Sequence, residues 1–286
     1  MGHKITEKMM KKYLKNFYKY RYLLYEIVRK NIKLQYRDSA LGIVWTFLQP
    51  LMTTLVLVFI FGNVFGKSNS GVVNYPIYLL CGRLLYEFYS QSTKRAMRSV
   101  RNSASVIKKV YVPKYIYPLA NVSSTFVTFC ISLLVLVCFI AFYVIRGTVN
   151  PEYAEMMPHI TPYMLLVFVP LIILFLLSIG VGLILSTLDV FFKDIDYLYE
   201  VFCLLLFYMT PIVYRIDSLK IDSEFFAYVM LANPMYSITE MFRCCVLYGK
   251  MFNMHHLEYS LGFAVVMLII GVIAFYKKQD KFILHI

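Results

Sequence analysis

Three acidic residues between two apolar runs are the first candidates for chemistry in this sequence. Asp189, Asp194 and Asp196 lie close together on either side of Phe191-Phe192-Lys193. Clustered acids at a membrane face are what a membrane-embedded transferase acting on a lipid-linked sugar would use for acid–base catalysis. A role in capping a helix or shaping a turn is the simpler interpretation, because aspartate side chains readily bond to nearby backbone groups. We therefore assign no catalytic residue here.

Arg83 and Glu87 form a second group, placed inside an apolar run. They are four residues apart, so on a helix they lie one turn from each other and can pair. Pairing lowers the cost of placing either charge in a bilayer. Two interpretations stay open: the pair faces a substrate path, or it only packs against neighbouring helices.

The remaining residue types give no sign of metal or nucleotide chemistry. His255 and His256 stand alone near the expected start of an outer helix, and the six cysteines show no Cys-X-X-Cys spacing. We expect the histidines to be interfacial and the cysteines to pack as small apolar residues. The sequence contains no GxxxxGK[ST], HExxH or GxSxG motif. We expect no metal site, no cofactor and no enzyme activity in this chain.

Composition places these groups in a membrane protein. Of 286 residues, 60% are hydrophobic, and the formal net charge is +13. Eleven Lys or Arg precede Gly42, seven lie from Lys94 to Lys114, and three more follow the last apolar run. This segregation is the positive-inside pattern, so the basic segments and both termini are expected in the cytoplasm and no nucleic-acid partner is implied. The first apolar run begins too late for a cleavable signal.

We predict an all-α integral membrane protein with six transmembrane helices. Residues 1–41 form a cytoplasmic arm whose apolar residues recur at helical spacing, which is typical of an amphipathic helix in the headgroup layer. Docking of this arm on a partner protein is the alternative. Residues 42–286 form the transmembrane domain. Its spans are predicted at about 43–65, 75–92, 119–145, 164–188, 197–213 and 257–276.

Particular residues set the bounds of these elements. Gly180 and Gly182 in the fourth span allow close helix approach, and Pro211 interrupts the fifth. The basic segment from Lys94 is helix-compatible up to about Val110. It is either a docking element for a cytoplasmic subunit or a solvated loop that only sets orientation. Between spans five and six, Asn233-Pro234 separates two short apolar pieces, which predicts a re-entrant helical hairpin.

Aromatic residues are abundant, with 25 Tyr and 23 Phe. Most are expected to face lipid or to pack between helices. Some could line a path in which rings stack on sugar faces and tyrosine hydroxyls form hydrogen bonds. The candidates for such a lining are Phe47, Tyr86, Phe88 and Tyr89.

Four stretches, in order along the chain, together resemble the polysaccharide-exporting members of the ABC-2 type permease family. They are Leu41-Gly42-Ile43-Val44-Trp45 followed by Leu48-Gln49-Pro50; Asn102 with Val106-Ile107-Lys108-Lys109-Val110-Tyr111-Val112-Pro113-Lys114; Phe191-Phe192-Lys193-Asp194-Ile195; and Asn233-Pro234-Met235 with Phe242-Arg243. The family usually has Arg at the position of Lys193. The Arg83 and Glu87 pair matches no motif of the family.

The resemblance implies the permease subunit of an exporter for O-antigen, teichoic acid or a related glycan on a polyprenyl-diphosphate lipid, in the cytoplasmic (inner) membrane. Two copies would form the channel as a homodimer, and each would dock on an ABC ATPase subunit that holds ATP and Mg. The family's coupling helix would fall at about 98–110 and its outer gate helices at about 223–248. An ABC-2 exporter of a small lipid or drug is the alternative, and a membrane-embedded transferase is the second.

The residue roles that follow are expectations. ATPase coupling is expected at Arg98, Arg101, Asn102, Lys108, Lys109, Lys193 and Asp194. The outer gate is expected at Asn233, Pro234 and Arg243. The lipid diphosphate headgroup is expected to pair with the cytoplasmic-side bases Arg29, Lys30, Lys33 and Arg37, because phosphates pair well with Arg or Lys near a membrane surface.

Overall fold

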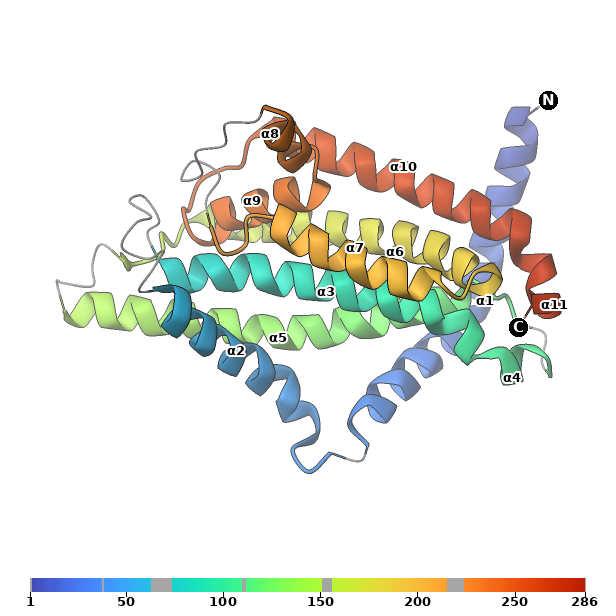
Figure 1. Ribbon diagram of the computed structural model, residues 1–286, viewed down its shortest axis with the longest axis horizontal. Coiled ribbons are helices and arrows are strands. Elements are labelled where there is room, and N and C mark those ends of the chain that lie inside the picture. Colours follow the sequence, from blue (N-terminus) through green and yellow to red (C-terminus); the bar gives the residue numbers. More distant parts are fainter. Residues whose placement is uncertain are drawn as a thin grey trace.

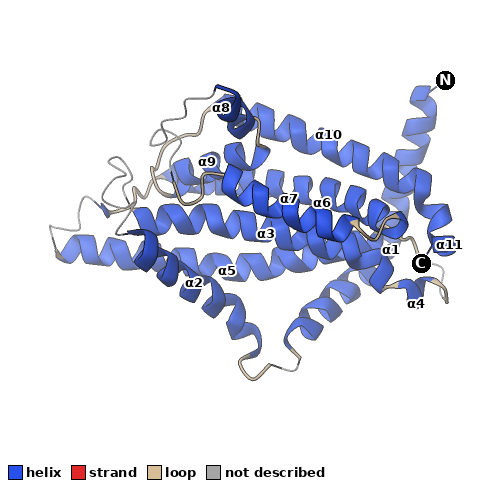
Figure 2. Ribbon diagram, viewed as in Figure 1, coloured by secondary structure: helices blue, strands red, loops and turns tan. Residues whose placement is uncertain are grey.

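The computed structural model describes residues 2–37, 39–62, 74–109, 112–150, 156–214 and 224–285. All regular elements in these ranges are helices (Figure 2), as predicted. In chain order they are α1 (Gly2–Tyr36), η1 (Gly42–Val44), α2 (Trp45–Gly62), α3 (Tyr75–Asn102), α4 (Ala104–Ile107), α5 (Ile116–Val149), η3 (Pro162–Val167), α6 (Phe168–Phe191), α7 (Ile195–Met209), α8 (Glu224–Leu231), α9 (Pro234–Val246), α10 (Met254–Lys278), η5 (Gln279–Lys281) and α11 (Phe282–His285).

A bundle of long helices forms the body of the molecule. Helices α3, α5, α6 and α10 run side by side along its long axis, and α7 lies against α3 and α6 (Figure 1). Helices α1 and α2 meet at an elbow that projects from the bundle. The short helices α8 and α9 lie at one end, whereas α4, α11 and both chain termini lie at the other. Below, these are called the α9 end and the α4 end.

Asparagine caps fix where three of the helices begin at the α9 end. The side chain of Asn74 accepts a hydrogen bond from the backbone of Ile77, 3.1 Å away, at the start of α3. Asn233 and Asn253 cap α9 and α10 in the same way, through the backbone N–H groups of Met235 and His255. Such caps satisfy amides that would otherwise have no partner within the helix. The predicted break at Asn233-Pro234 is confirmed.

Close packing of α6 on α10 depends on small residues. A Cβ atom on Gly180 would lie 2.6 Å from the backbone nitrogen of Leu268. On the opposite helix, a Cβ on Gly271 would meet the carbonyl oxygen of Gly180. The two backbones therefore approach more closely than larger side chains permit, as the predicted role of Gly180 required.

Four helical segments in the described part of the chain are long and apolar enough to cross a membrane: Gly42–Ile60, Ile116–Val149, Pro162–Phe191 and Met254–Leu284. Helix α3 is not among them, and it carries Arg83, Glu87 and several basic residues near its end. Helix α7 has 15 residues and ends at Met209, before Pro211, so it is shorter at this end than the predicted fifth span of about 197–213. Residues 63–65 of the first predicted span lie outside the described residues.

The basic segment after the second predicted span is organised differently from the expectation. A separate coupling helix was expected at about 98–110, but α3 continues without a break to Asn102. Only the short helix α4 follows, and Val110 lies outside the described residues. The hydropathy falls after Ser92 while the helix goes on, because Lys, Arg, Ala and Met are all good helix formers.

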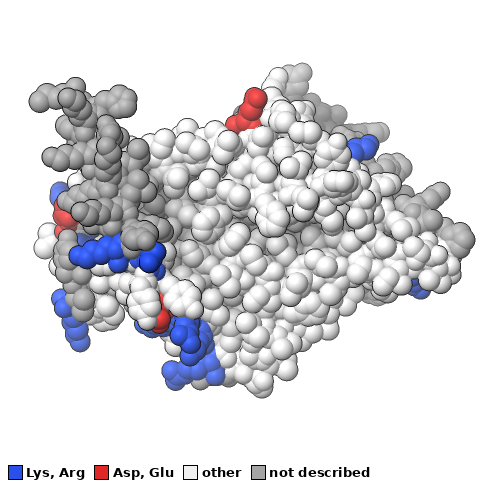
Figure 3. Space-filling model, turned by 180° about the vertical axis from the view of Figure 1, so that it is seen from behind, with Lys and Arg blue, Asp and Glu red and all other residues white. Residues whose placement is uncertain are grey.

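Charge is distributed along the long axis. Lys and Arg side chains gather toward the α4 end, and the broad centre of the face in Figure 3 is uncharged. An uncharged central face beside a basic end is typical of membrane proteins, in which Lys and Arg gather on one side.

Candidate functional site

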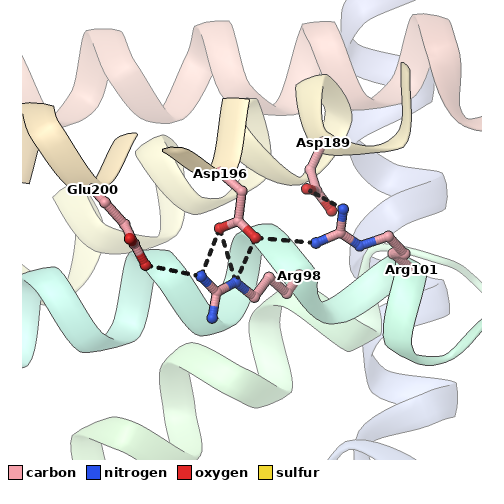
Figure 4. A network of polar contacts seen from close by, with 5 residues as sticks. All are labelled: Arg98, Arg101, Asp189, Asp196 and Glu200. Atoms are coloured by element: carbon pink, nitrogen blue, oxygen red, sulfur yellow. Dashed lines mark hydrogen bonds and ion pairs between the residues drawn. The ribbon is translucent and has the colours of Figure 1, made fainter. Parts of the chain in front are cut away.

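Two arginines at the end of α3 hold the connection between α6 and α7 (Figure 4). Arg98 donates from Nε to both carboxylate oxygens of Asp196, at 2.8 and 2.9 Å. Its Nη2 lies 3.1 Å from Oε1 of Glu200, one turn further along α7. Nη2 also lies 2.7 Å from Oδ1 of Asp196, so Arg98 contacts this carboxylate at two points, the geometry in which an arginine–carboxylate pair is strongest.

Arg101 bridges α6 and α7. Its Nη2 donates to Asp196 at 3.3 Å, and its Nη1 lies 3.1 Å from Oδ1 of Asp189. The side chain of Asp189 has no solvent-exposed surface, whereas that of Arg101 is 32% exposed. The Arg101–Asp189 contact is an ion pair by distance but lacks the alignment of a hydrogen bond. The buried carboxylate of Asp189 is therefore compensated by the charge of Arg101.

The network explains the electrostatics of Asp196. Burial raises the pKa of this carboxyl, but the contacts with Arg98 and Arg101 outweigh burial and hold the pKa below its usual range. Asp196 also lies in the first turn of α7, where the helix dipole favours an acid. The charged form of Asp196 is thus favoured by two independent effects.

The predicted capping or turn role is wrong for Asp189 and Asp196, whereas Asp194 does lie in the turn between α6 and α7. Asp189 lies inside α6, and both Asp189 and Asp196 face the arginines of α3. Asp194 occupies the residue before α7, but its side chain makes no capping hydrogen bond. The partners lie about a hundred positions away in the chain, so local sequence could not reveal them.

The other predicted coupling residues lie on the surface at the α4 end. Asn102, Lys108, Lys109, Lys193 and Asp194 are all exposed. Among them stand two exposed apolar side chains, Val106 at 43% and Phe192 at 64% exposure. Arg98 and Arg101 instead direct their guanidinium groups to acids of the same chain. The structure therefore separates the seven into five surface residues and two residues of an internal network.

A pocket of about 600 Å³ lies between α2, α3 and α7. Four polar side chains of α3 line it, at the helical spacing that places them on one face: Arg83, Glu87, Ser90 and Gln91. Apolar residues from α2 and α7 complete the wall, namely Met52, Val56, Leu57 and Phe207. Arg83 and Glu87 approach each other to 3.9 Å, which confirms their pairing.

A smaller cavity of about 80 Å³ lies near the start of α2, between α2, α3 and α5 and toward the α1–α2 elbow. Glu87 and Gln91 line both cavities. The small cavity is rich in hydroxyl and amide groups, from Gln35, Tyr36, Thr46, Gln49, Thr125, Thr128 and Ser132. A polar chamber of this size holds water readily. Polar groups thus extend from the elbow to the middle of α3.

The four predicted channel-lining aromatics lie in different surroundings. Tyr86 lines the larger pocket, its hydroxyl donating to the carbonyl of Cys203. Phe88 lines the smaller cavity but is only 2% exposed, and it packs on Phe126 and Phe129. Tyr89 is buried in the core. Phe47 is partly buried against that core.

At the α9 end a buried arginine ties three elements together. Arg243 of α9 has no exposed surface, and its Cζ lies 3.5 Å from the centre of the Tyr78 ring. It donates to the carbonyls of Tyr78 and Ile212 and to the carboxylate of Glu240. A Cβ on Gly82 would lie 2.8 Å from its Nη2, so glycine leaves the space that the guanidinium occupies. Arg243, one of the three predicted gate residues, therefore holds α9 against α3 and the segment at Ile212.

The other predicted gate residues, Asn233 and Pro234, lie at the start of α9. Asn233 donates from Nδ2 to Oγ1 of Thr210, 2.9 Å away, and Pro234 is the first residue of α9.

The predicted headgroup bases lie toward the α1–α2 elbow. The four bases Arg29, Lys30, Lys33 and Arg37 are all exposed near the end of α1. Their neighbour Gln35 accepts a hydrogen bond from Arg95 of α3 at 2.8 Å.

Sequence reasoning missed several residues of these sites. Gln91 was detectable, because it continues the polar face of α3 one turn after Glu87. Gly82, Thr210 and Glu200 carried no such signal, since their roles depend on contacts with distant elements.

Comparison with known proteins identifies the family of this chain. A model of the ABC-2 type transporter family matches residues 22–247. The chain is 27% identical over 262 residues to the O-antigen export system permease protein RfbA of Klebsiella pneumoniae, covering 91% of this chain and 93% of the relative. It is 25% identical over 271 residues to RfbA of Myxococcus xanthus, covering 94% and 97%. It is 24% identical over 255 residues to the polysialic acid transport protein KpsM of Escherichia coli, covering 88% and 91%. On the strength of the match to residues 22–247, the chain belongs to the ABC-2 type transporter family.

Proposed function

We propose that this chain is the permease subunit of an ATP-driven exporter that moves a polysaccharide, linked to a polyprenyl-diphosphate lipid, across the cytoplasmic membrane. The relatives named for O-antigen export and polysialic acid transport support a glycan as the cargo. The observation that carries the proposal is the polar face of α3 on the pocket between α2, α3 and α7. A hydrated chain needs such a face at a depth where the neighbouring helices are apolar.

The same face argues for a homodimer of six-span subunits. Arg83 lies eight residues into α3, so it is about 12 Å from the start of the helix, near the middle of a bilayer. Its side chain is 17% exposed and that of Glu87 is 25% exposed. Charges at this depth avoid lipid and face protein or water. A second copy placed against α2 and α7 would cover the pair and enclose a path along α3.

The surface at the α4 end is the proposed docking site for an ABC ATPase subunit, one on each of the two copies. Val106 and Phe192 supply apolar contact, and Lys108, Lys109 and Lys193 supply charge around them. An apolar centre with a polar rim is the usual anatomy of a protein interface. The partner holds ATP and Mg, and this chain has no catalytic role.

The ion pairs of Arg98 and Arg101 connect this docking surface to the helices of the bundle. Arg98 and Arg101 fix the end of α3 to α6 and α7, so a push on α4 moves these helices as one body. At the opposite end Arg243 fixes α9 to α3. In this proposal α8 and α9 form the re-entrant outer gate, and both termini lie in the cytoplasm.

Co-purification with the ATPase encoded beside this chain tests the proposal. We expect a complex of two copies of each subunit whose ATP hydrolysis in lipid nanodiscs responds to a polyprenyl-linked glycan. Replacing Lys108 and Lys109 together by Ala should lower this hydrolysis. Lys277 and Lys281 are exposed at the same end of the molecule. Replacing both by Ala removes the same amount of charge and should leave ATP hydrolysis unchanged. A chain that binds no ATPase, or acts on lipid-linked sugar without one, contradicts the proposal. Stimulation by a small lipid or drug alone would assign a different cargo.

A further inference from the structure

Arg83 and Glu87 in the large pocket form an ion pair without a direct hydrogen bond. The closest atoms, Nε of Arg83 and Oε2 of Glu87, are 3.9 Å apart, which is beyond hydrogen-bond range. The other carboxylate oxygen of Glu87 accepts a hydrogen bond from Gln91 at 3.0 Å. Arg83 carries five N–H donors. Among the described residues none accepts a hydrogen bond from them, so the pair retains binding capacity toward the pocket.

The rest of the pocket wall suits a sugar ring. Tyr86 and Phe207 form an edge-to-face pair with centroids 5.1 Å apart, and both line the pocket. The hydroxyl of Tyr86 is bonded to the carbonyl of Cys203, which holds this ring in place. Aromatic carbon surface beside amide, hydroxyl and charged groups combines apolar contact for C–H faces with hydrogen bonds for hydroxyl groups.

We propose that Arg83, Glu87 and Gln91 form a subsite that binds the hydroxyl groups of an uncharged sugar and discriminates against acidic sugars. This inference rests on the proposed function and narrows its cargo. A sugar hydroxyl both donates and accepts, so one hydroxyl, or two neighbouring ones, can accept from Arg83 and donate to Glu87. The loose spacing of the pair leaves room for this bridge.

The discrimination follows from charge. Arg83 and Glu87 together carry no net charge, so the subsite offers an anion no net attraction. A sugar carboxylate can accept from Arg83 but cannot donate to Glu87, and the two carboxylates repel each other strongly in surroundings of low dielectric. Specificity of this kind comes from the repulsive element as much as from the attractive one. Glu87 is that element here.

Binding to the intact complex with its ATPase in nanodiscs tests the subsite. The probes are maltohexaose, which is uncharged, and hexasialic acid, which is acidic, with affinities measured by calorimetry. We expect the wild type to bind maltohexaose at least about tenfold more tightly. Glu87→Gln removes the repulsion and should narrow this preference. Gln91→Glu adds a carboxylate and should increase the preference for maltohexaose. The two variants are expected to change the preference in opposite directions, so either one tests the proposal if the other fails to fold.

Matched controls place the same changes elsewhere. Glu258→Gln alters an exposed carboxylate of α10 outside the pocket, and should leave the preference unchanged. Arg83→Gln should weaken maltohexaose binding. Equal binding of both probes by the wild type, or a preference that neither Glu87→Gln nor Gln91→Glu alters, overturns the subsite. Either result leaves ATPase docking intact, whereas a chain that binds no ATPase would instead refute the proposed function.

Discussion

The guanidinium of Arg243 lies over the ring of Tyr78, with its Cζ 3.5 Å from the ring centre, although the two residues are 165 positions apart. A cation held so closely over a ring and fully removed from water gains more than an exposed one. The carbonyls of Tyr78 and Ile212 and the carboxylate of Glu240 satisfy its donors. Helix α9 is thereby fixed to the first half of α3, and the contact depends on the space above Gly82.

The first prediction concerns that space. Gly82→Ala places a Cβ 2.8 Å from Nη2 of Arg243 and 3.4 Å from the backbone of Ile212. Because Arg243 is fully buried, its guanidinium cannot move into solvent to avoid the new methyl group. We therefore expect a loss of about 1–3 kcal/mol in the free energy of unfolding. Thermal unfolding in detergent measures it. Gly262→Ala on α10 is the control, since nothing lies within 4 Å of a Cβ there. It should be neutral or stabilising, and equal melting of the two variants would contradict the packing argument.

The second prediction compares the loss of stability when either partner of the Arg101–Asp189 ion pair is replaced. Arg101→Gln leaves the buried carboxylate of Asp189 without its cation, and should destabilise the chain by about 3–5 kcal/mol. Asp189→Asn removes the buried charge and leaves Arg101 partly exposed and still paired with Asp196, so it should cost less. In the double variant most of the Arg101→Gln loss should be recovered. Additive losses in the four-member cycle would show that the two side chains do not depend on each other.

A third prediction uses pH. Because the pKa of Asp196 is depressed in the folded chain, its contribution to stability is present above the unfolded value, near 3.8, and is lost as pH falls through the folded value. Asp196→Asn should therefore lower the melting temperature at pH 7, and the difference from the wild type should shrink as pH falls below about 4. Asp194→Asn, whose side chain makes no capping hydrogen bond, is the control and should show little difference at either pH. If the difference in melting temperature between Asp196→Asn and the wild type stays constant with pH, the ion pairs are not its cause.

The sequence predicted the helices more fully than it predicted the contacts between them. Apolar runs and the Asn233-Pro234 dipeptide carry local signals, and they located α2, α5, α6, α10 and the start of α9. The end of α3 was misplaced because hydropathy falls at Ser92 whereas helix propensity persists to Asn102. Hydropathy reports the surrounding solvent, and the backbone of a long helix can cross from lipid into water without a break.

Partners distant in the chain account for the rest. Arg98 and Arg101 were predicted to couple to the ATPase, whereas the structure pairs them with acids that lie 88–102 positions later in the chain. The role of Gly82 depends on a side chain from α9. Such pairings are set by how the helices pack, and no local pattern encodes them. The polar face of α3 was readable in principle, since Arg83, Glu87 and Gln91 recur every four residues in an apolar span.

The last prediction concerns capture of the lipid diphosphate by the α1–α2 elbow. Lys33 and Arg37 are exposed there, next to the small polar cavity that begins at Gln35 and Tyr36. A basic residue near a membrane surface attracts anionic lipid by about 1 kcal/mol, so Lys33→Ala with Arg37→Ala should weaken apparent affinity for the lipid-linked glycan by about thirtyfold. Transport into inverted vesicles, whose cytoplasmic face is outside, should fall at low substrate and recover at high substrate.

The control for this pair removes equal charge further along the same helix. Lys19→Ala with Arg21→Ala lies several turns from the elbow, and should change export much less. Raised salt should reduce the difference between wild type and the elbow variant, because exposed phosphate contacts are screened. If the elbow variant exports normally at low substrate, capture by this arm is wrong. If both double variants lose export equally, the arm contributes only its overall charge, and the position of Lys33 and Arg37 beside the polar cavity has no special role.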